Sequence, residues 1–319
     1  MQISREFIYE NIATIPACHA STVLPLADGT VVCAWFAGTG EGKDDVGIYT
    51  SVRKNGVWAA PVRRDNVTNL PHWNPVLDEN NGVIRLYFKE GKKIPHWITY
   101  YCESFDGGQT FTPQKELVEG DRTGGRGPVK NKILHTKNGL LLAPLSTEYR
   151  GWKCYADISS DGGNTWTKSK LITRPLNGKI PVGLIQPTFR EVDGKIYALM
   201  RSNAGFIYSA VSSDGGYTWS KAQKTDMPNN NSGLDSVYAN GKLYLVFNPV
   251  GDNWGERTPL RLSVSADNGK SWSVVADLEN TPGEYSYPAI TEKDGILHIT
   301  YTYNRKKIAY VTVSELDFE

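Results

Sequence analysis

Short segments in which apolar and polar residues alternate recur along the whole chain. The clearest are Val31–Phe36, Ile84–Phe88, Lys195–Met200, Lys242–Phe247 and Ile296–Tyr303. A period of two, bounded by turn-forming residues, predicts β-strands, and the 31 glycines and 17 prolines of the chain supply such boundaries. No segment of about a dozen residues carries a helical period. We therefore expect an all-β fold.

One eight-residue motif, Ser-x-Asp-x-Gly-x-Thr/Ser-aromatic, recurs four times. The copies are Ser104–Phe111, Ser159–Trp166, Ser212–Trp219 and Ser265–Trp272, and their aspartates are 55, 53 and 53 residues apart. Each copy has the chemistry of a turn: the Asp accepts backbone hydrogen bonds, the Gly permits positive φ, and the aromatic residue anchors the turn. Val52–Trp58 resembles a fifth, degenerate copy about one period earlier.

A repeat of this length indicates the architecture. A period near 53 residues with about four strands per repeat is typical of a β-propeller blade, and a chain of 319 residues holds six such blades. The last repeat lacks a strand because the chain ends soon after Ile308–Val313, so we expect Arg5–Glu10 to supply it and close the ring. Cutting a closed ring would expose strand edges, and we therefore expect one domain over residues 1–319.

The overall charge is close to balanced. Thirty-five Lys and Arg against 34 Asp and Glu give a net charge of +1, which argues against nucleic acid or an anionic membrane surface as a partner. No apolar run approaches the roughly 20 residues that span a bilayer. Arg5, Glu6 and Glu10 interrupt the N-terminal stretch where an export signal would be apolar, so we expect a cytoplasmic protein.

The four cysteines, Cys18, Cys33, Cys102 and Cys154, are scattered without CxxC spacing. This arrangement predicts free thiols rather than a disulfide framework or a zinc site. No histidine or carboxylate cluster has the spacing of metal ligands, and no glycine loop has the pattern of a phosphate cradle. We expect neither a metal nor a cofactor.

A propeller gathers the ends of its inner strands at one mouth of the central tunnel, so its site is built from one or two polar residues per blade. The candidates between the repeated turns include His19, Glu41, Asp45, His72, Asn74, Lys89, Arg126, Lys130, Glu148, Gln186, Arg201, Arg257, Tyr285, Tyr287 and Arg305.

Several of these candidates also have simpler explanations. Tyr285 and Tyr287 could be core residues of an alternating strand, and His72 could pack in the interior or stack on a sugar. Asp45 has an adjacent carboxylate at Asp44, and neighbouring residues on an extended backbone point in opposite directions. We favour Asp45 because it adjoins the strand that begins at Val46. Arg126 and Lys130 could belong to a solvated loop, although the Gly-Pro pair between them favours a fixed turn at the mouth.

The repeated turns resemble the Asp-boxes of the sialidase superfamily, and the resemblance extends over nearly the whole chain. The stretch from His19 to Thr30 resembles the opening blade of sialidases, with His19 where the first arginine of their triad would stand. The stretch Gln186–Arg201 resembles the blade with the second arginine, and the one starting at Arg257 resembles the blade with the third. The resemblance implies that Arg201 and Arg257 bind a substrate carboxylate through charge-assisted hydrogen bonds.

The same resemblance suggests catalytic roles. Glu284–Ser286 resembles the Tyr-Ser motif at the sialidase nucleophile, which gives that role to Tyr285, and the loop Glu41–Asp45 lies where their general acid is found. A neutral phenol avoids the repulsion that a carboxylate nucleophile would meet beside an acidic sugar. Sialidases activate the tyrosine with a glutamate at the position of Gln186, and an amide cannot accept a proton. The chain therefore resembles a divergent branch, the predicted neuraminidases.

Three functions follow as alternatives. The first is an exo-acting glycoside hydrolase of the exo-α-sialidase class that removes a terminal acidic sugar from an oligosaccharide or glycoconjugate. The second is an oligosaccharide or polysaccharide lyase, with His19 or His72 and a tyrosine as base and acid, and an arginine on the uronate carboxylate. The third is a sugar-binding propeller without catalysis. The sequence leaves the sugar, the linkage and the stereochemical course open.

Overall fold

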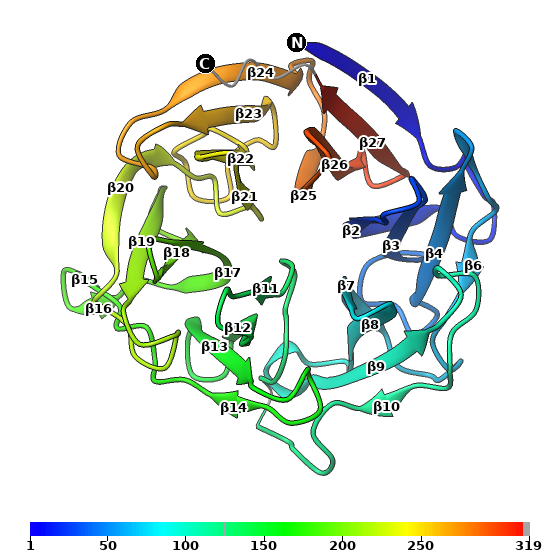
Figure 1. Ribbon diagram of the computed structural model, residues 1–319, viewed down its shortest axis with the longest axis horizontal. Helices are drawn as coiled ribbons and strands as arrows, with labels where there is room; N and C mark the ends of the chain where they lie inside the picture. The colour runs from blue at the N-terminus through cyan, green and yellow to red at the C-terminus, as the bar shows by residue number, and fades with distance from the viewer. Residues whose placement is uncertain (124, 315–319) are drawn as a thin grey trace.

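The computed structural model describes residues 1–123 and 125–314, and their strands form six antiparallel blades around a central axis (Figure 1). Blade 1 contains β2 (Ala17–Pro25), β3 (Val31–Gly38), β4 (Gly47–Lys54) and β5 (Val57–Trp58), with β6 (Val62–Arg63) also paired to β4. Blade 2 contains β7 (His72–Asn80), β8 (Val83–Glu90), β9 (Ile98–Ser104) and β10 (Lys115–Glu116). Blade 3 contains β11 (Leu134–His135), β12 (Leu141–Thr147), β13 (Lys153–Ser159) and β14 (Thr167–Lys168).

The second half of the ring repeats this order. Blade 4 contains β17 (Leu184–Val192), β18 (Lys195–Ser202), β19 (Phe206–Ser212) and β20 (Gln223–Pro228), preceded by a hairpin of β15 (Leu176–Asn177) and β16 (Ile180–Pro181). Blade 5 contains β21 (Asp235–Ala239), β22 (Lys242–Phe247), β23 (Leu260–Ser265) and β24 (Ser273–Glu279). Blade 6 contains β25 (Tyr285–Lys293), β26 (Ile296–Tyr303), β27 (Lys307–Ser314) and the N-terminal β1 (Gln2–Phe7). Within these residues the helical structure is one 3₁₀ turn, Ile94–His96. The predicted all-β, six-bladed propeller is confirmed.

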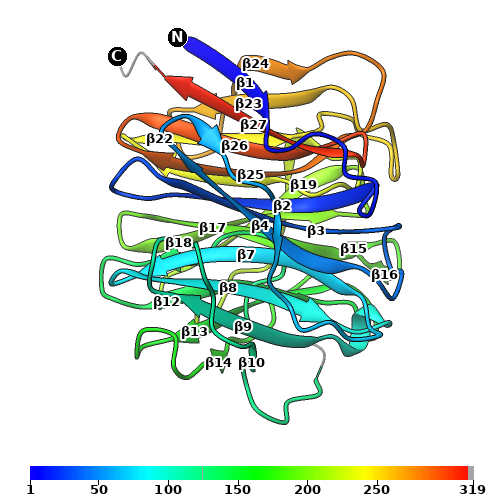
Figure 2. The ribbon, with the colours of Figure 1, turned by 90° about the vertical axis from the view of Figure 1, so that its right-hand side faces the viewer.

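The N-terminal strand closes the ring. β1 pairs with β27 from Gln2 opposite Ser314 to Phe7 opposite Ala309, and both views place it at the outer edge of the last blade (Figures 1 and 2). The predicted closure is confirmed, but the strand ends at Phe7 instead of Glu10. The chain leaves the sheet there because Tyr9 stacks on Trp35 of blade 1, with ring centroids 5.1 Å apart.

The four Asp-box turns share one hydrogen-bond pattern. In the second copy the hydroxyl of Ser159 donates to Asp161 at 2.8 Å and accepts from the Gly163 N–H at 2.8 Å. The backbone and hydroxyl of Thr165 donate to the same carboxylate at 2.9 and 2.6 Å. Such hydrogen bonds favour the ionised acid; in the first copy they lower the pKa of Asp106 to about 2.

The predicted fifth, degenerate copy, Val52–Trp58, lies between the third and fourth strands of blade 1, as the Asp-boxes do in blades 2 to 5, but it forms a shorter turn. Lys54 pairs with Val57 and Arg53 with Trp58, so the strands are joined by the two residues Asn55 and Gly56. Both have positive φ, 52° and 82°, which is typical of a two-residue β-hairpin. The segment has no aspartate to organise the longer turn.

Four innermost strands carry a β-bulge that matters for the site. The register shifts between His19 and Thr22 in β2, Trp73 and Val76 in β7, Ile185 and Thr188 in β17, and Ser286 and Ala289 in β25. At each bulge one residue has left-handed φ, namely Ala20 (55°), Asn74 (44°), Gln186 (52°) and Tyr287 (53°). A bulge breaks the alternation of a strand and redirects a side chain. These four positions therefore occupy equivalent places around the axis.

The cysteine prediction is confirmed, since all four thiols are free and buried. Among the described residues, no helix is long and apolar enough to span a membrane.

Candidate functional site

Tyr287 lies at the centre of a polar cluster at the mouth. Its phenolic Oη accepts a hydrogen bond from Arg201 Nη1 at 2.7 Å and one from Gln186 Nε2 at 3.4 Å. Its ring lies against the imidazole of His19, with centroids 4.1 Å apart, and the guanidinium of Arg257 lies 5.7 Å from the ring centroid. Blades 1, 4, 5 and 6 all contribute to this cluster.

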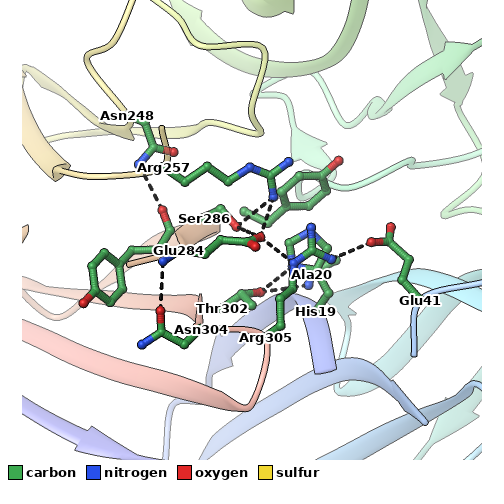
Figure 3. Close-up of polar contacts among 12 residues, drawn as sticks. His19, Ala20, Glu41, Asn248, Arg257, Glu284, Ser286, Thr302, Asn304 and Arg305 are labelled. Carbon is green, nitrogen blue, oxygen red and sulfur yellow. Dashed lines mark hydrogen bonds and ion pairs between the residues drawn. The ribbon is translucent and has the colours of Figure 1, made fainter. Parts of the chain in front are cut away.

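Three arginines belong to this cluster. Arg201 is the last residue but one of β18, Arg257 precedes β23, and Arg305 lies in the turn between β26 and β27. Glu284 joins two of them, because its Oε1 accepts from Arg257 Nη1 at 2.8 Å and from Arg305 Nε (Figure 3). Within the described residues, Nη2 of each guanidinium has no hydrogen-bond partner. Three cationic donors thus remain available to an anion.

His19 does not add a further cation. The side chain is buried, and its Nδ1 lies 2.8 Å from Thr302 Oγ1 (Figure 3). Burial and the charges of Arg305, Arg257 and Arg201 hold the pKa of His19 well below its usual value. The imidazole is therefore neutral at neutral pH. Arg305, from a different blade, supplies the third guanidinium of the cluster.

Lys130 supports the backbone beside the site. Its buried Nζ donates to Asn131 Oδ1 at 2.8 Å, to Leu234 O at 3.1 Å and to the carbonyl of Pro288. Burial lowers the pKa of this lysine to about 7. Because Nζ donates to the carbonyl of Pro288, the amine holds in place the residue that follows Tyr287.

The acidic loop of blade 1 places one carboxylate at the mouth. Glu41 Oε2 accepts a hydrogen bond from Arg305 Nη1 (Figure 3). Asp45 instead accepts from the backbone and hydroxyl of Thr39, both at 2.8 Å, and so closes its own loop. The structure brings Glu41 to the site and leaves Asp45 outside it.

Two depressions adjoin this cluster. The one with more empty space, about 580 Å³ with the part open to solvent included, is called the larger pocket below and is lined by Glu41, Trp73, Asn74, Lys89, Ile94, Trp97, Thr99, Val129, Ser146, Thr147, Glu148, Ile185, Gln186 and Tyr287. The other, of about 450 Å³, is lined in part by His19, Glu41, Glu284 and Arg305. Glu41 lines both depressions.

Tyr285 does not reach the mouth, contrary to its predicted role. Its side chain is 1% exposed and packs in the core between blades 5 and 6, and its Oη lies 2.9 Å from Thr281 Oγ1. The spacing of two would put Tyr285 and Tyr287 on one face of a regular strand. The bulge after Ser286 breaks that alternation, so only Tyr287 lies with the arginines.

His72 and Arg126 also have structural partners instead of open positions. His72 is 0% exposed, with Nε2 3.1 Å from Glu90 Oε2 and Nδ1 3.1 Å from Val46 O. Arg126 donates to both oxygens of Asp157, at 2.8 and 3.0 Å. The expected substrate contacts of these two residues are not supported. Asn74 does line the larger pocket and donates to Val129 O at 3.2 Å.

Lys89 and Glu148, two polar candidates of the sequence to which no role was assigned, line the same pocket. Lys89 Nζ donates to Thr99 Oγ1 at 2.7 Å and to the carbonyl of Arg126, and burial lowers its pKa to about 7. Both residues stand at the end of a blade's second strand, as Arg201 does. That shared position in the blades was the sequence signal that could have assigned both residues to the site.

Comparison with known proteins places this geometry in a family. Residues 29–299 match the model described as the BNR repeat-like domain. The chain belongs to the BNR repeat-like domain family. This confirms the predicted membership of the BNR-repeat proteins. No match was found among curated protein sequences.

Solved structures of similar fold include two sialidases. The Hadza microbial sialidase Hz136 has a TM-score of 0.77 at 15% identity, over 95% of this chain and 66% of that one. Trypanosoma rangeli sialidase in complex with the inhibitor DANA has a TM-score of 0.76 at 14% identity, over 99% and 60%. A protein of unknown function from Dyadobacter fermentans has a TM-score of 0.76 at 15% identity, over 97% and 98%. The chain thus spans about two thirds or less of these sialidases and nearly all of the third protein.

Proposed function

We propose that the protein is an exo-acting glycoside hydrolase that removes a terminal acidic sugar from an oligosaccharide or glycoconjugate. The observation that carries this proposal is a cluster of three guanidinium ions beside a pocket: Arg201 donates to the hydroxyl of Tyr287, Arg257 lies 5.7 Å from its ring centroid, and Arg305 is joined to Arg257 through Glu284. Within the described residues, Nη2 of each guanidinium has no hydrogen-bond partner. Planar guanidinium groups suit a carboxylate better than ammonium groups do. The fold shared with sialidases supports the same substrate class.

The geometry suggests how the reaction proceeds. Arg201, Arg257 and Arg305 bind the sugar carboxylate, and Glu284 balances part of their charge in the free protein. Tyr287 attacks the anomeric carbon, and the N–H of Arg201 on its Oη stabilises the negative charge that develops on that oxygen.

Glu41 is the proton donor of this scheme. It protonates the leaving oxygen as the glycosidic bond breaks, and its carboxylate then takes a proton from the water that attacks the glycosyl–tyrosine bond. The contact between Glu41 and Arg305 joins this group to the carboxylate-binding cluster. Tyr287 replaces Tyr285 as nucleophile in this proposal, and Glu41 replaces Asp45 as acid.

A uronate lyase is the second candidate, because a neutral imidazole, His19, lies against Tyr287. A neutral imidazole can abstract a proton next to a carboxylate, while a phenol protonates the leaving oxygen.

Product analysis separates the alternatives. The wild-type protein is incubated with sialosides and with uronic-acid-capped oligosaccharides, and reducing sugar and ultraviolet-absorbing unsaturated product are measured. We expect reducing sugar without unsaturated product. Unsaturated uronate would support the lyase, whereas saturable binding of an acidic sugar without either product would overturn catalysis in favour of a sugar-binding propeller.

A further inference from the structure

Glu148 is a carboxylate of the larger pocket to which the proposed chemistry gives no role. It follows β12 directly and lines the pocket together with Gln186 and Tyr287. Its Oε2 accepts a hydrogen bond from Trp152 Nε1 at 3.0 Å, while its Oε1 has no hydrogen-bond partner within the described residues. One oxygen is therefore held and the other is available for proton transfer.

The residue that touches the tyrosine hydroxyl cannot take its proton. Gln186 presents its Nε2 to Tyr287 Oη at 3.4 Å, while its Oε1 accepts from Arg201 Nη1 at 3.1 Å. Both ends of the amide are thus used, and an amide is not a base at neutral pH. Lys130 Nζ donates to carbonyl and amide oxygens, and the His19 imidazole lies tilted by 45° against the tyrosine ring, with its Nδ1 on the hydroxyl of Thr302. The phenolic proton needs another acceptor.

Glu148 is connected to this tyrosine through Arg201. The indole of Trp152, which donates to Glu148, lies 5.4 Å from the Arg201 guanidinium, and that guanidinium donates to Tyr287. The strands β12 and β17 are also in contact here, since the Gln186 N–H donates to Ser146 Oγ at 3.2 Å. Blade 3 therefore presents its carboxylate to the same space that the blade 4 bulge occupies.

We propose that Glu148 accepts the phenolic proton of Tyr287 through an intervening water molecule, a step that rests on the hydrolase function proposed above. The O–H bond of Tyr287 breaks and a carboxylic acid forms on Glu148, while the phenolate oxygen bonds to the anomeric carbon and the glycosidic bond breaks. When water later displaces the tyrosine, the phenolate recovers its proton from Glu148. The carboxylate is then ready for the next turnover.

The charges around the carboxylate suit this role. Burial raises the pKa of Glu148, and the Trp152 hydrogen bond and the charge of Arg201 oppose that rise in part. Lys89 and Glu41 face the same pocket. A carboxylate with a raised pKa is a stronger base than an exposed one, so proton transfer from a phenol is easier.

The test compares Glu148→Gln with the wild type on an acidic glycoside. Glutamine keeps an acceptor for the Trp152 N–H but cannot take a proton, so we expect kcat to fall by ~10²–10⁴-fold with KM little changed. We also expect the acidic limb of the kcat–pH profile to disappear. Glu119→Gln, an exposed carboxylate away from the pocket, is the matched control and should behave as wild type.

A second variant tests whether the missing function is a base. In Glu148→Gln/Gln186→Glu, the new carboxylate stands beside Tyr287 Oη, and we expect it to restore kcat at least tenfold. Unchanged kcat in Glu148→Gln, with wild-type turnover intact, would overturn this inference alone. A lower kcat in Glu148→Gln would also overturn it if the kcat–pH profile kept its acidic limb and the second substitution, Gln186→Glu, did not restore kcat. That pattern indicates that Glu148 positions other groups and is not the base. A wild type without hydrolase activity would overturn the proposed function, and this inference with it.

Discussion

The position of a single bulge decides which tyrosine lies in the site. Tyr285 and Tyr287 are two residues apart, yet one is in the core and the other lies in the arginine cluster. The sequence did contain a sign of this, because Asn74, Gln186 and Tyr287, which all have positive φ in the structure, are each followed by proline. Comparing the inner strands with one another, as equivalent positions, would have singled out Tyr287.

Other residue-level predictions failed because they depend on partners far away in sequence. Nothing around His72 in the sequence shows that Glu90 and Asp65 will enclose it, or that Arg126 will pair with Asp157 across 31 residues. Charged residues between strands look the same whether they bind a ligand or join two blades. Only the ring geometry separates the two cases.

The buried amine of Lys89 predicts a pH dependence of stability. Its pKa in the folded protein is lowered to about 7, below that of an unfolded lysine, so between these two values the unfolded chain binds more protons. Stability therefore rises with pH across this window, and the cost of burying the charge is fully present below it. We expect a higher unfolding midpoint at pH 9 than at pH 7, measured by thermal denaturation. In Lys89→Met the rise should be smaller; an equal rise would contradict this assignment.

At the scale of elements, the second strands of the blades were predicted best. The five alternating segments all fall within β3, β8, β18, β22 and β26. Each of these strands packs one of its two faces on the preceding blade and the other on the following blade. The four Asp-boxes were also predicted from local chemistry alone, because Ser, Asp and Thr bond within a few residues of one another. The two-residue strand β11 has too little alternation to be read from sequence.

The glycine of an Asp-box is required for contact between blades as well as for φ. Gly216 has φ +93°, and an added Cβ would meet Leu142 Cδ2 at 2.4 Å. We expect Gly216→Ala to lower the free energy of unfolding by about 2–4 kcal/mol, from strain and overpacking together, as measured by denaturant titration. Gly241→Ala is the matched control, with φ +77° and nothing within 4 Å. Equal losses in the two variants would contradict the packing argument.

At the scale of the whole molecule, the ring depends on the first strand. β1 covers the edge of β27, and its residues reach the neighbouring blades on both sides: Arg5 pairs with Glu279, and Glu6 accepts from Arg53 at 2.6 Å. The closure joins the two ends of the chain (Figure 1).

Removal of residues 1–7 should therefore open this edge. We expect the truncated protein to unfold at a temperature roughly 5–10 °C lower and to associate through the exposed strand, as followed by thermal denaturation and size-exclusion chromatography. Arg5→Gln/Glu6→Gln keeps the strand but removes its ion pairs, and should remain unassociated. A truncated protein with unchanged melting and elution would contradict the role given to β1.

The arginine cluster is a local feature of a nearly neutral protein. The net charge is only +1, so an acidic ligand is attracted by the mouth and not by the molecule as a whole. The function proposed here therefore depends on the cluster around Tyr287 more than on any other part of the ring.

The most direct test of this account is the rate of aglycone release from aryl glycosides of sialic acid and of hexuronic acids, measured for the wild type, Tyr287→Phe and Tyr285→Phe. We predict that the wild type releases aglycone from at least one acidic glycoside, that Tyr287→Phe loses at least ~10³-fold in kcat, and that Tyr285→Phe keeps most of the activity. Wild-type rates in Tyr287→Phe, or no release from any acidic glycoside, would contradict the account.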